Sequence, residues 1–140
     1  MTTAAFKHRD LTDRIIGVFY AVYKELGSGF LESVYEHSMA VALAQAGIAS
    51  IRQCPLQVHF RGQIVGEFRV DIIVENAVIM ELKSARTICR EHEAQVLNYL
   101  RASTMEVALI LNFGPRPELR RLAYENTRKC TRALASRPAT

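Results

Sequence analysis

The stretch FRVDIIVENAVIMELK, from Phe68 to Lys83, decides the fold, because it reads as two strands joined by a tight turn. Apolar residues alternate along both halves, which gives each strand one apolar face. That face carries Phe68, Val70, Ile72 and Val74 on the first strand and Val78, Met80 and Leu82 on the second. The pattern predicts a buried antiparallel hairpin whose opposite side carries an Asp, a Glu and a Lys.

The register of this hairpin determines whether its two acidic residues meet. Opposed residues of an antiparallel pair share a face, and a slip of one residue exchanges the two faces. A three-residue turn over 75–77 opposes apolar residues throughout, including Val70 to Leu82, and sets Asp71 opposite Glu81. A two-residue turn would oppose Asp71 to Leu82 and break the apolar pairing. The hydrophobic pattern therefore predicts two carboxylates side by side.

Two opposed carboxylates destabilise a sheet unless a cation offsets their repulsion. Two unit charges about 4 Å apart repel by on the order of 4 kcal/mol at an effective dielectric of roughly 20. Lys83 lies beyond Glu81 on the same face and supplies one positive charge. A bound Mg²⁺ would complete the compensation, because this hard cation takes carboxylate oxygens and keeps several waters.

The length and charge of the chain indicate one domain with a basic end. A chain of 140 residues, 49% of them hydrophobic, can bury a sizeable core. We expect a single domain over residues 1–126 and a basic, flexible tail over residues 127–140. Residues 114–140 hold seven Lys or Arg and two Glu, a charge of +5, so the other 113 residues sum to −1 in a chain of net charge +4. Such a segment can bind a phosphate backbone or be a solvated terminus.

The sequence shows no sign of export or of a membrane span. The N-terminus lacks the plan of a signal peptide, and no apolar run approaches the ~18 residues that span a bilayer. The three cysteines are widely spaced and form no CxxC pair, so they support neither a zinc cluster nor a disulfide framework. We therefore expect a cytoplasmic protein without a membrane partner.

Helical and strand patterns alternate along the rest of the chain. Helices are expected over about 10–26, 31–46 and 88–102, a strand over 56–60, a strand buried on both faces over 106–112, and a last helix over 118–124. The buried strand follows the hairpin through a helix, which fits a right-handed crossover to a parallel neighbour.

Two of these helices carry polar residues that could face the hairpin. Glu32 stands at the start of the second helix on the side of Tyr35, where the helix dipole alone would explain a carboxylate. It could equally be a third acidic ligand. His92, Gln95 and Tyr99 form a polar stripe on the third helix, and such a stripe is more often a solvated face than a site.

Three motifs in order resemble a known superfamily. Asp71, nine intervening residues and then ELK at 81–83 resemble the D…ExK motif of the PD-(D/E)XK nuclease-like superfamily. GFLESVY at 29–35 looks like the signature of the GxxExxY proteins, a small bacterial and archaeal family placed in that superfamily. HEAQ at 92–95 resembles the later helix motif of the same family. The resemblance covers about 10–126.

The resemblance implies an α/β fold with a three-layer αβββαβ core, a mixed central sheet and an extra N-terminal helix. It implies that Asp71 and Glu81 are metal ligands and that Lys83 is the catalytic lysine. Glu32 carries over as the acidic residue of the first core helix, as a ligand or a catalytic group. Gln95 carries over as the helix residue that faces the site.

These residue types support metal-assisted hydrolysis of a phosphodiester, so we expect a metal-dependent nuclease acting on DNA. Mg²⁺, or Mn²⁺, would activate a water and polarise a phosphoryl oxygen, while a lysine offsets the charge developing on phosphorus. Arg69, His92 and Tyr35 are the candidates for contacting nucleic acid. The resemblance also allows a homodimer, since many compact nucleases need two subunits to cut both strands.

Two other interpretations stay open at this point. The fold could be a non-catalytic module that binds nucleic acid or a protein partner, since the chain outside 114–140 is weakly acidic. The charged residues of the hairpin could instead form a solvated salt-bridge ladder, which contributes about 0–1 kcal/mol per pair.

Overall fold

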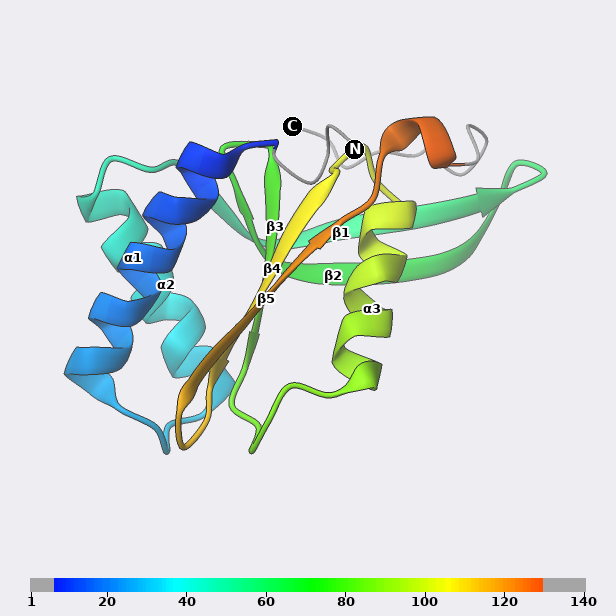
Figure 1. Ribbon diagram of the computed structural model, residues 1–140. Helices are drawn as coiled ribbons and strands as arrows, with labels where there is room; N and C mark the ends of the chain where they lie inside the picture. Colours follow the sequence, from blue (N-terminus) through cyan, green and yellow to red (C-terminus); the bar gives the residue numbers. More distant parts are fainter. Residues whose placement is uncertain (1–6, 130–140) are drawn as a thin grey trace.

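The computed structural model describes residues 7–129 and arranges them in three layers (Figure 1). The elements are α1 (Arg9–Leu26), α2 (Glu32–Gln45), β1 (Ser50–Phe60), β2 (Gln63–Val74), β3 (Val78–Lys83), α3 (Arg90–Arg101), β4 (Val107–Phe113), β5 (Pro117–Ala123) and the short 3-10 helix η2 (Asn126–Arg128). α1 and α2 lie on one side of a five-stranded sheet, and α3 lies on the other. The predicted three-layer α/β architecture is confirmed.

The sheet is mixed, with the strand order β1-β2-β3-β4-β5. β3 and β4 run parallel and are joined through α3, whereas the other neighbours are antiparallel. The carboxyl ends of β3 and β4 therefore meet at the same edge of the sheet. In α/β sheets this edge is where ligands commonly bind.

The predicted register of the β2–β3 hairpin is confirmed for the three residue pairs next to the turn. The paired residues are Ile72 and Met80, Ile73 and Ile79, and Val74 and Val78. The amide of Ala77 donates to the carbonyl of Val74 at 2.9 Å and closes the turn. Glu75 and Asn76 adopt left-handed backbone angles, with φ of 52° and 56°. Such angles give a turn whose twist matches that of the two strands.

The hairpin departs from the prediction at Asp71, where β2 changes the side that it buries. Ile72 packs in the core under α1 and α2, whereas Val70 packs in the core on the side of α3. Gln53 of β1 lies opposite this point and has a φ of 55°, which breaks the regular alternation of side chains. The predicted pairing of Val70 with Leu82 is therefore wrong, because Leu82 belongs to the other core.

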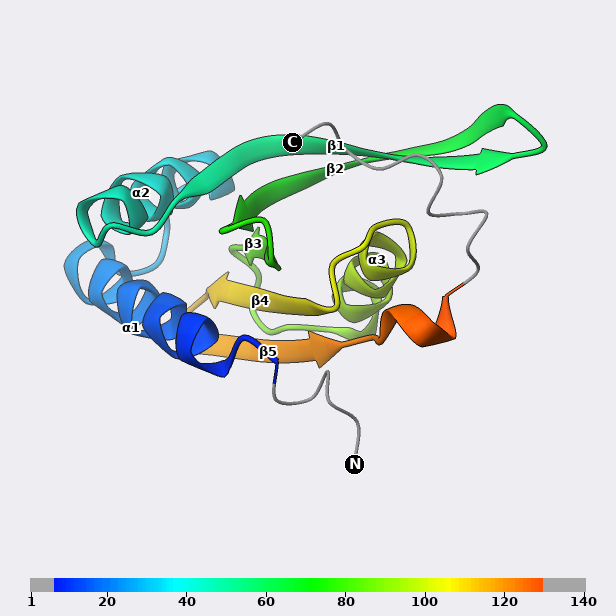
Figure 2. The ribbon, with the colours of Figure 1, turned by 90° about the horizontal axis from the view of Figure 1, so that it is seen from above.

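Beyond this point, β1 and β2 continue as a two-stranded arm that curves past α3 (Figure 2). β1 begins at Ser50, earlier than predicted, and its register with β2 shifts at Val58 and His59, opposite Gly66. A bulge of this kind bends a strand and increases its twist.

The helix predicted over 118–124 is wrong, because these residues form most of β5, which pairs antiparallel with β4. Every residue of β4 is buried, so its outer edge needs hydrogen-bonding partners that water cannot supply. Leu119 and Leu122 have the spacing of a helical stripe, which misleads the sequence pattern. In the strand this odd spacing sends each leucine to a different core.

The predicted tail over 127–140 lies mostly outside the described residues. Within them, Lys129 is buried, and its ammonium donates to the carbonyls of Ser103 at 3.0 Å and Met105 at 2.5 Å. Within residues 7–129, no helix combines the length and the apolar surface that crossing a bilayer requires.

Candidate active site

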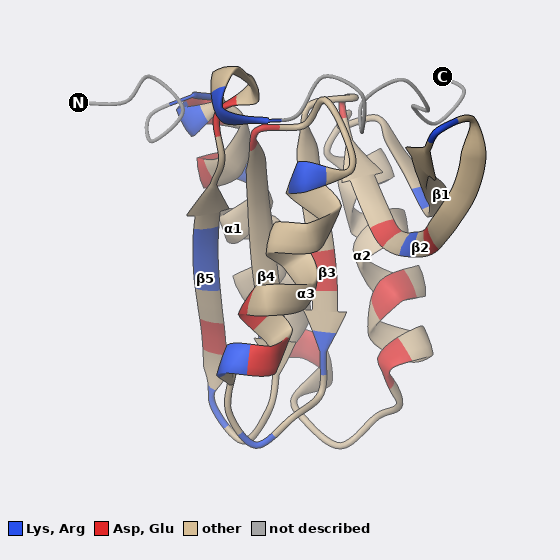
Figure 3. Cartoon of the chain, turned by 90° about the vertical axis from the view of Figure 1, so that its right-hand side faces the viewer, with Lys and Arg blue, Asp and Glu red and all other residues tan. Residues whose placement is uncertain are grey.

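The five residues predicted for the site lie on four elements that meet around β3. Asp71 is on β2, Glu81 and Lys83 are on β3, Glu32 begins α2, and Gln95 is on α3. A hydrogen bond, an ion pair or a charge interaction links each of them to another member of the set. Figure 3 shows acidic stretches of α2, β2 and β3 on the same side of the molecule.

The two carboxylates of the hairpin lie beside each other, although β2 leaves the β3 ladder just before this point. The carboxylate of Asp71 accepts the amide N–H of Leu82 at 2.8 Å. The amide of Asp71 lies 3.5 Å from Oε1 of Glu81, at the outer limit of a hydrogen bond. Where the two strands separate, contacts between these acidic side chains and backbone amides therefore replace the regular backbone hydrogen bonds of the ladder.

Burial makes this pair electrostatically unfavourable. Glu81 is only 4% exposed. Burial, and next the charge of Asp71, raise the pKa of Glu81 from 4.5 to about 8. Burial is also the main cause that raises the pKa of Asp71 from 3.8 to about 6, against the hydrogen bond from Leu82. Near neutral pH the pair therefore needs a proton or a cation.

Lys83 supplies part of the missing positive charge and is itself held in place. Its Nζ lies 3.8 Å from Oε2 of Glu81 and donates to Oε1 of Gln95 at 3.0 Å. Nε2 of Gln95 donates in turn to the hydroxyl of Tyr99 at 2.8 Å. Burial and the charges of the two acids raise the pKa of Tyr99 to about 12, so this hydroxyl stays protonated. Sequence reasoning placed Tyr99 on the polar stripe of this helix but did not name it as a site residue, although its spacing of four from Gln95 was a usable signal.

Glu32 stands at the rim of the site. Its side chain is exposed, and Oε2 lies 3.4 Å from the amide of Ser84, the residue after Lys83. The charge of Glu32 also contributes to the raised pKa values of Asp71 and Glu81. Glu32 therefore belongs to the same electrostatic cluster.

The three residues predicted to contact nucleic acid have different surroundings. Tyr35 is fully buried, so a direct contact of its ring with nucleic acid is wrong. Its hydroxyl donates to the carbonyl of Gly27 at 2.6 Å and braces the loop before α2. His92 accepts the amide N–H of Cys89 at 3.2 Å and caps α3. Arg69 is exposed and donates to the carbonyl of Gln53, the β1 residue opposite Asp71.

Sequence reasoning missed a second cluster, in which Glu36 is held by Arg52 and Gln53. Glu36 is 7% exposed by residue area. Oε2 of Glu36 accepts from Arg52 at 2.6 and 2.9 Å, and Oε1 accepts from Gln53 at 2.6 Å. The spacing of four from Glu32 was the available signal, whereas the left-handed backbone of Gln53 leaves no trace in the sequence.

Asp71 and Glu81 offer two carboxylates for a divalent metal, without a third protein ligand beside them among the described residues. Among residues 7–129, no three His, Cys, Asp or Glu side chains converge closely enough to cage a metal ion. Asp71 and Glu81 nevertheless offer two desolvated carboxylates that a single lysine compensates only in part. Mg²⁺ commonly binds through one or two carboxylates, with water and substrate phosphates completing its shell. The pair is sufficient for a site of that kind.

Comparison with known proteins gives one family and two solved structures. The sequence model of the PD-(D/E)XK nuclease superfamily matches residues 9–122. The crystal structure of SSO0001 aligns with a TM-score of 0.53 at 14% identity, over 66% of this chain and 50% of that chain. Archaeoglobus fulgidus Hjc, a Holliday junction resolvase from an archaeal hyperthermophile, aligns with a TM-score of 0.40 at 25% identity, over 64% of this chain and 72% of that chain. No curated protein gives a significant match.

The match to SSO0001 concerns the fold alone. The aligned part of this chain spans half the length of that protein.

Proposed function

This chain belongs to the PD-(D/E)XK nuclease superfamily, and on that basis we propose that it is a metal-dependent nuclease that hydrolyses phosphodiester bonds in DNA. One observation carries the proposal. The half-buried carboxylate of Asp71 and the buried carboxylate of Glu81 lie together beside a lysine that Gln95 holds in place. Strongly perturbed acids with a specific charged partner are a common feature of functional sites.

The proposed site would bind Mg²⁺ or Mn²⁺ through Asp71 and Glu81, and Glu32 would add its charge from the rim. The bound cation would supply Lewis acidity toward the phosphoryl oxygen and an activated water. The carboxylates then exchange their unfavourable mutual repulsion for attraction to the cation. Burial strengthens that attraction, because the local dielectric is low.

Lys83 would stabilise the charge that develops on phosphorus. An ammonium has three donors, and the contacts with Gln95 and Glu81 leave at least one for a phosphoryl oxygen or the attacking water. Tyr99 fixes the amide of Gln95 by accepting its N–H, so the lysine needs little reorganisation during the reaction. Gln95 and Tyr99 are therefore positioning residues in this mechanism.

Membership of the GxxExxY family, a cytoplasmic location and a homodimer remain parts of the proposal. The GxxExxY stretch is supported by the local structure, because each of its three named residues has a distinct task. Gly29 has a φ of 111°, Glu32 reaches the amide after Lys83, and Tyr35 braces the preceding loop.

The test is cleavage of plasmid, linear and single-stranded DNA, with RNA alongside, in Mg²⁺ or Mn²⁺. Wild type should cleave DNA only with metal, and Asp71→Asn should abolish cleavage. Asp13→Asn is the matched control, because Asp13 is an exposed aspartate on α1 outside the cluster. Absence of metal-dependent cleavage of every substrate, or equal cleavage by wild type and Asp71→Asn, would overturn the proposal.

The alternative is a non-catalytic module that keeps this fold to bind nucleic acid or a protein. The lack of a third converging ligand among residues 7–129 favours it. It predicts nucleic acid binding that neither requires metal nor changes in Asp71→Asn, with no cleavage under any condition.

A further inference from the structure

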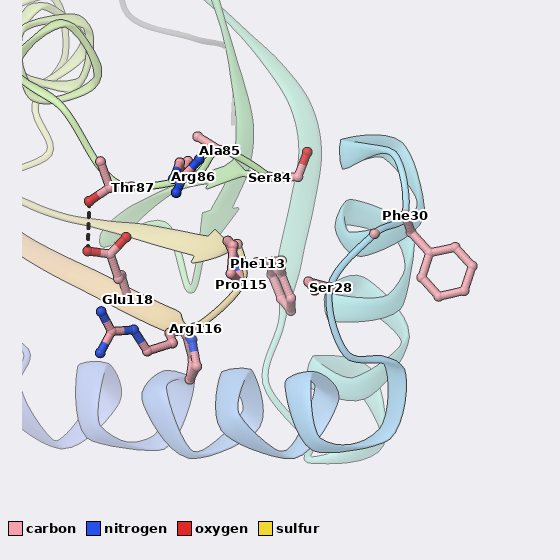
Figure 4. A pocket seen from close by; sticks show the side chains of 13 residues that line it. Ser28, Phe30, Ser84, Ala85, Arg86, Thr87, Phe113, Pro115, Arg116 and Glu118 are labelled. Atoms are coloured by element: carbon pink, nitrogen blue, oxygen red, sulfur yellow. Dashed lines mark hydrogen bonds between the residues drawn. The ribbon is translucent and has the colours of Figure 1, made fainter.

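A hollow of about 1080 Å³ opens at the end of the sheet where β3 and β4 finish. Its walls are the loop before α2, the loop after β3 and the loop between β4 and β5. Figure 4 shows Arg86 and Arg116 on the last two loops, and it shows Phe30 turned away from the hollow. No described aromatic ring therefore extends from the loop before α2 to fill this space.

The hollow adjoins the candidate active site. Ser84, which lines it, directly follows Lys83, and its amide faces the carboxylate of Glu32 at 3.4 Å. Gly29 and Phe30, which also line it, are separated by Leu31 alone from α2, which begins at Glu32. A strand whose scissile phosphate lay at Lys83 would therefore have its neighbouring nucleotides at the mouth of the hollow.

The floor of the hollow is built from buried polar contacts. Asn112 is fully buried, and its amide group both accepts from the N–H of Ala85 at 2.9 Å and donates to the carbonyl of Ala85 at 3.0 Å. A Cβ on Gly114 would lie 2.2 Å from that carbonyl, so only glycine allows this approach of the two loops. The two loops are thus clasped before any ligand arrives, which lowers the entropic cost of binding.

The rim of the hollow is basic and carries two exposed guanidinium groups. Arg86 and Arg116 are exposed, and neither makes an ion pair or hydrogen bond with any side chain that the structure describes. The one lining carboxylate, Glu118, is occupied by Thr87 at 3.1 Å and by the amide of Ile88 at 3.2 Å. Figure 3 shows basic stretches in the loops at this lower end of the molecule. Planar guanidinium groups bind phosphate oxygens in a bidentate manner.

We propose that this hollow binds one or two unpaired nucleotides of a DNA strand beside the bond that is cut, with Arg86 and Arg116 on the phosphates. The inference rests on the proposed nuclease function and names the substrate as DNA with a single-stranded segment at the cleavage position. The volume is at the upper end of small-ligand sites, which leaves room for one or two nucleotides of one strand.

The test measures binding and not cleavage. Fluorescence anisotropy with a single-stranded oligonucleotide and a duplex of the same sequence, in EDTA, gives dissociation constants over a range of salt. Wild type should prefer the single strand. Arg86→Ala and Arg116→Ala should each weaken single-strand binding by roughly tenfold, the size expected for one charge-assisted contact. Each should also lower the salt slope by about 0.7.

Arg14→Ala is the matched control, since Arg14 is an exposed arginine of α1 that contacts the carbonyl of Ala46 at the far end of α2. It should bind within about twofold of wild type, and thermal melting should show that all variants remain folded. Arg86→Lys, which keeps the charge without the planar fork, should bind between wild type and Arg86→Ala.

Unchanged single-strand affinity in both alanine variants overturns the inference, and so does an equal loss of duplex and single-strand affinity. Because binding is measured in EDTA, its outcome does not depend on whether the protein cleaves DNA in the separate test with metal. Loss of binding in the arginine variants without any metal-dependent cleavage by wild type would keep the hollow as a binding site and reject the nuclease.

Discussion

Two clusters, one around Glu36 and one around Asp71 and Glu81, lie close enough to interact, yet the charges of their carboxylates are compensated very differently. Glu36 accepts two hydrogen bonds from Arg52 and one from Gln53, all shorter than 3 Å. The pair of Asp71 and Glu81 shares one ammonium, which lies 3.8 Å from Glu81. The charge of Glu36 is one cause of the raised pKa of Asp71. The cluster around Glu36 therefore makes ionisation of Asp71 less favourable.

This difference in the number of donors distinguishes a carboxylate with a structural role from one with a functional role. A buried charge with all its hydrogen bonds satisfied fixes the position of its neighbours, here the left-handed Gln53 beside Asp71. A buried pair with too few partners has an unfavourable electrostatic energy that a bound cation would relieve. Burial and acidity alone do not distinguish the two clusters, whereas the count of donors around each carboxylate does.

The largest expected difference between the clusters is in activity. Lys83→Met should lower metal-dependent cleavage by about 10²–10³-fold, because it removes a preorganised charge from the developing transition state. Arg52→Met, the matching change in the other cluster, should lower cleavage much less and mainly reduce stability. Steady-state cleavage rates of folded protein check this expectation. Equal losses of cleavage rate in Lys83→Met and Arg52→Met would show that the two clusters do not differ in their role in cleavage.

A large change in stability is expected from the satisfied cluster. Glu36→Ala should lower the free energy of unfolding by about 2–3 kcal/mol, because it leaves Arg52 and Gln53 without their buried acceptor. Chemical denaturation measures this value. Glu25→Ala, at an exposed glutamate of α1, should change it by less than about 0.5 kcal/mol. A Glu36→Ala protein as stable as the control would show that the cluster contributes no net stability.

The unsatisfied cluster should respond in the opposite direction. Without metal at pH 8, Asp71→Asn should raise the free energy of unfolding by on the order of 1 kcal/mol, since it removes repulsion from Glu81 and keeps an oxygen for the N–H of Leu82. Chemical denaturation in EDTA shows whether Asp71→Asn raises or lowers the free energy of unfolding. A loss of more than about 2 kcal/mol would mean that the pair is a stabilising structural feature.

The same cluster should also make the stability of the protein depend on pH. Glu81 has a pKa of about 8 in the folded protein and an ordinary value of 4.5, so the folded state binds more protons than the unfolded state between these values. The free energy of unfolding of metal-free protein should therefore fall as pH rises from about 4.5 to about 8. Glu81→Gln should flatten this fall, most visibly above pH 6. An identical slope in both proteins would contradict the assignment.

The sequence predicts the hairpin and its two acidic residues because both depend on a local pattern. Alternating apolar residues fixed the register over Ile72–Val74. Just beyond the paired residues, the amide of Asp71 lies 3.5 Å from Oε1 of Glu81. The motif residues Glu32 and Gln95 could be placed near the pair only through the family resemblance, since their approach depends on the packing of helices.

What escaped the sequence depends on the tertiary structure. β5 forms a strand because the buried edge of β4 requires a partner, which overrides a helical spacing of leucines. Gln53 has a left-handed backbone opposite Asp71, where β2 changes the side that it buries. A glutamine gives no sign of such a conformation in the sequence. Asn112 looked like the end of an apolar strand, and only its contacts reveal that it clasps the loops of the hollow.

Calorimetric titration with Mn²⁺ at pH 8 tests the central claim most directly, because it examines the cation site without requiring a substrate. Wild type should bind Mn²⁺ at a carboxylate-dependent site, Asp13→Asn should bind it equally well, and Asp71→Asn should lose it. Equal binding by wild type and Asp71→Asn, or no binding by wild type, would contradict the account.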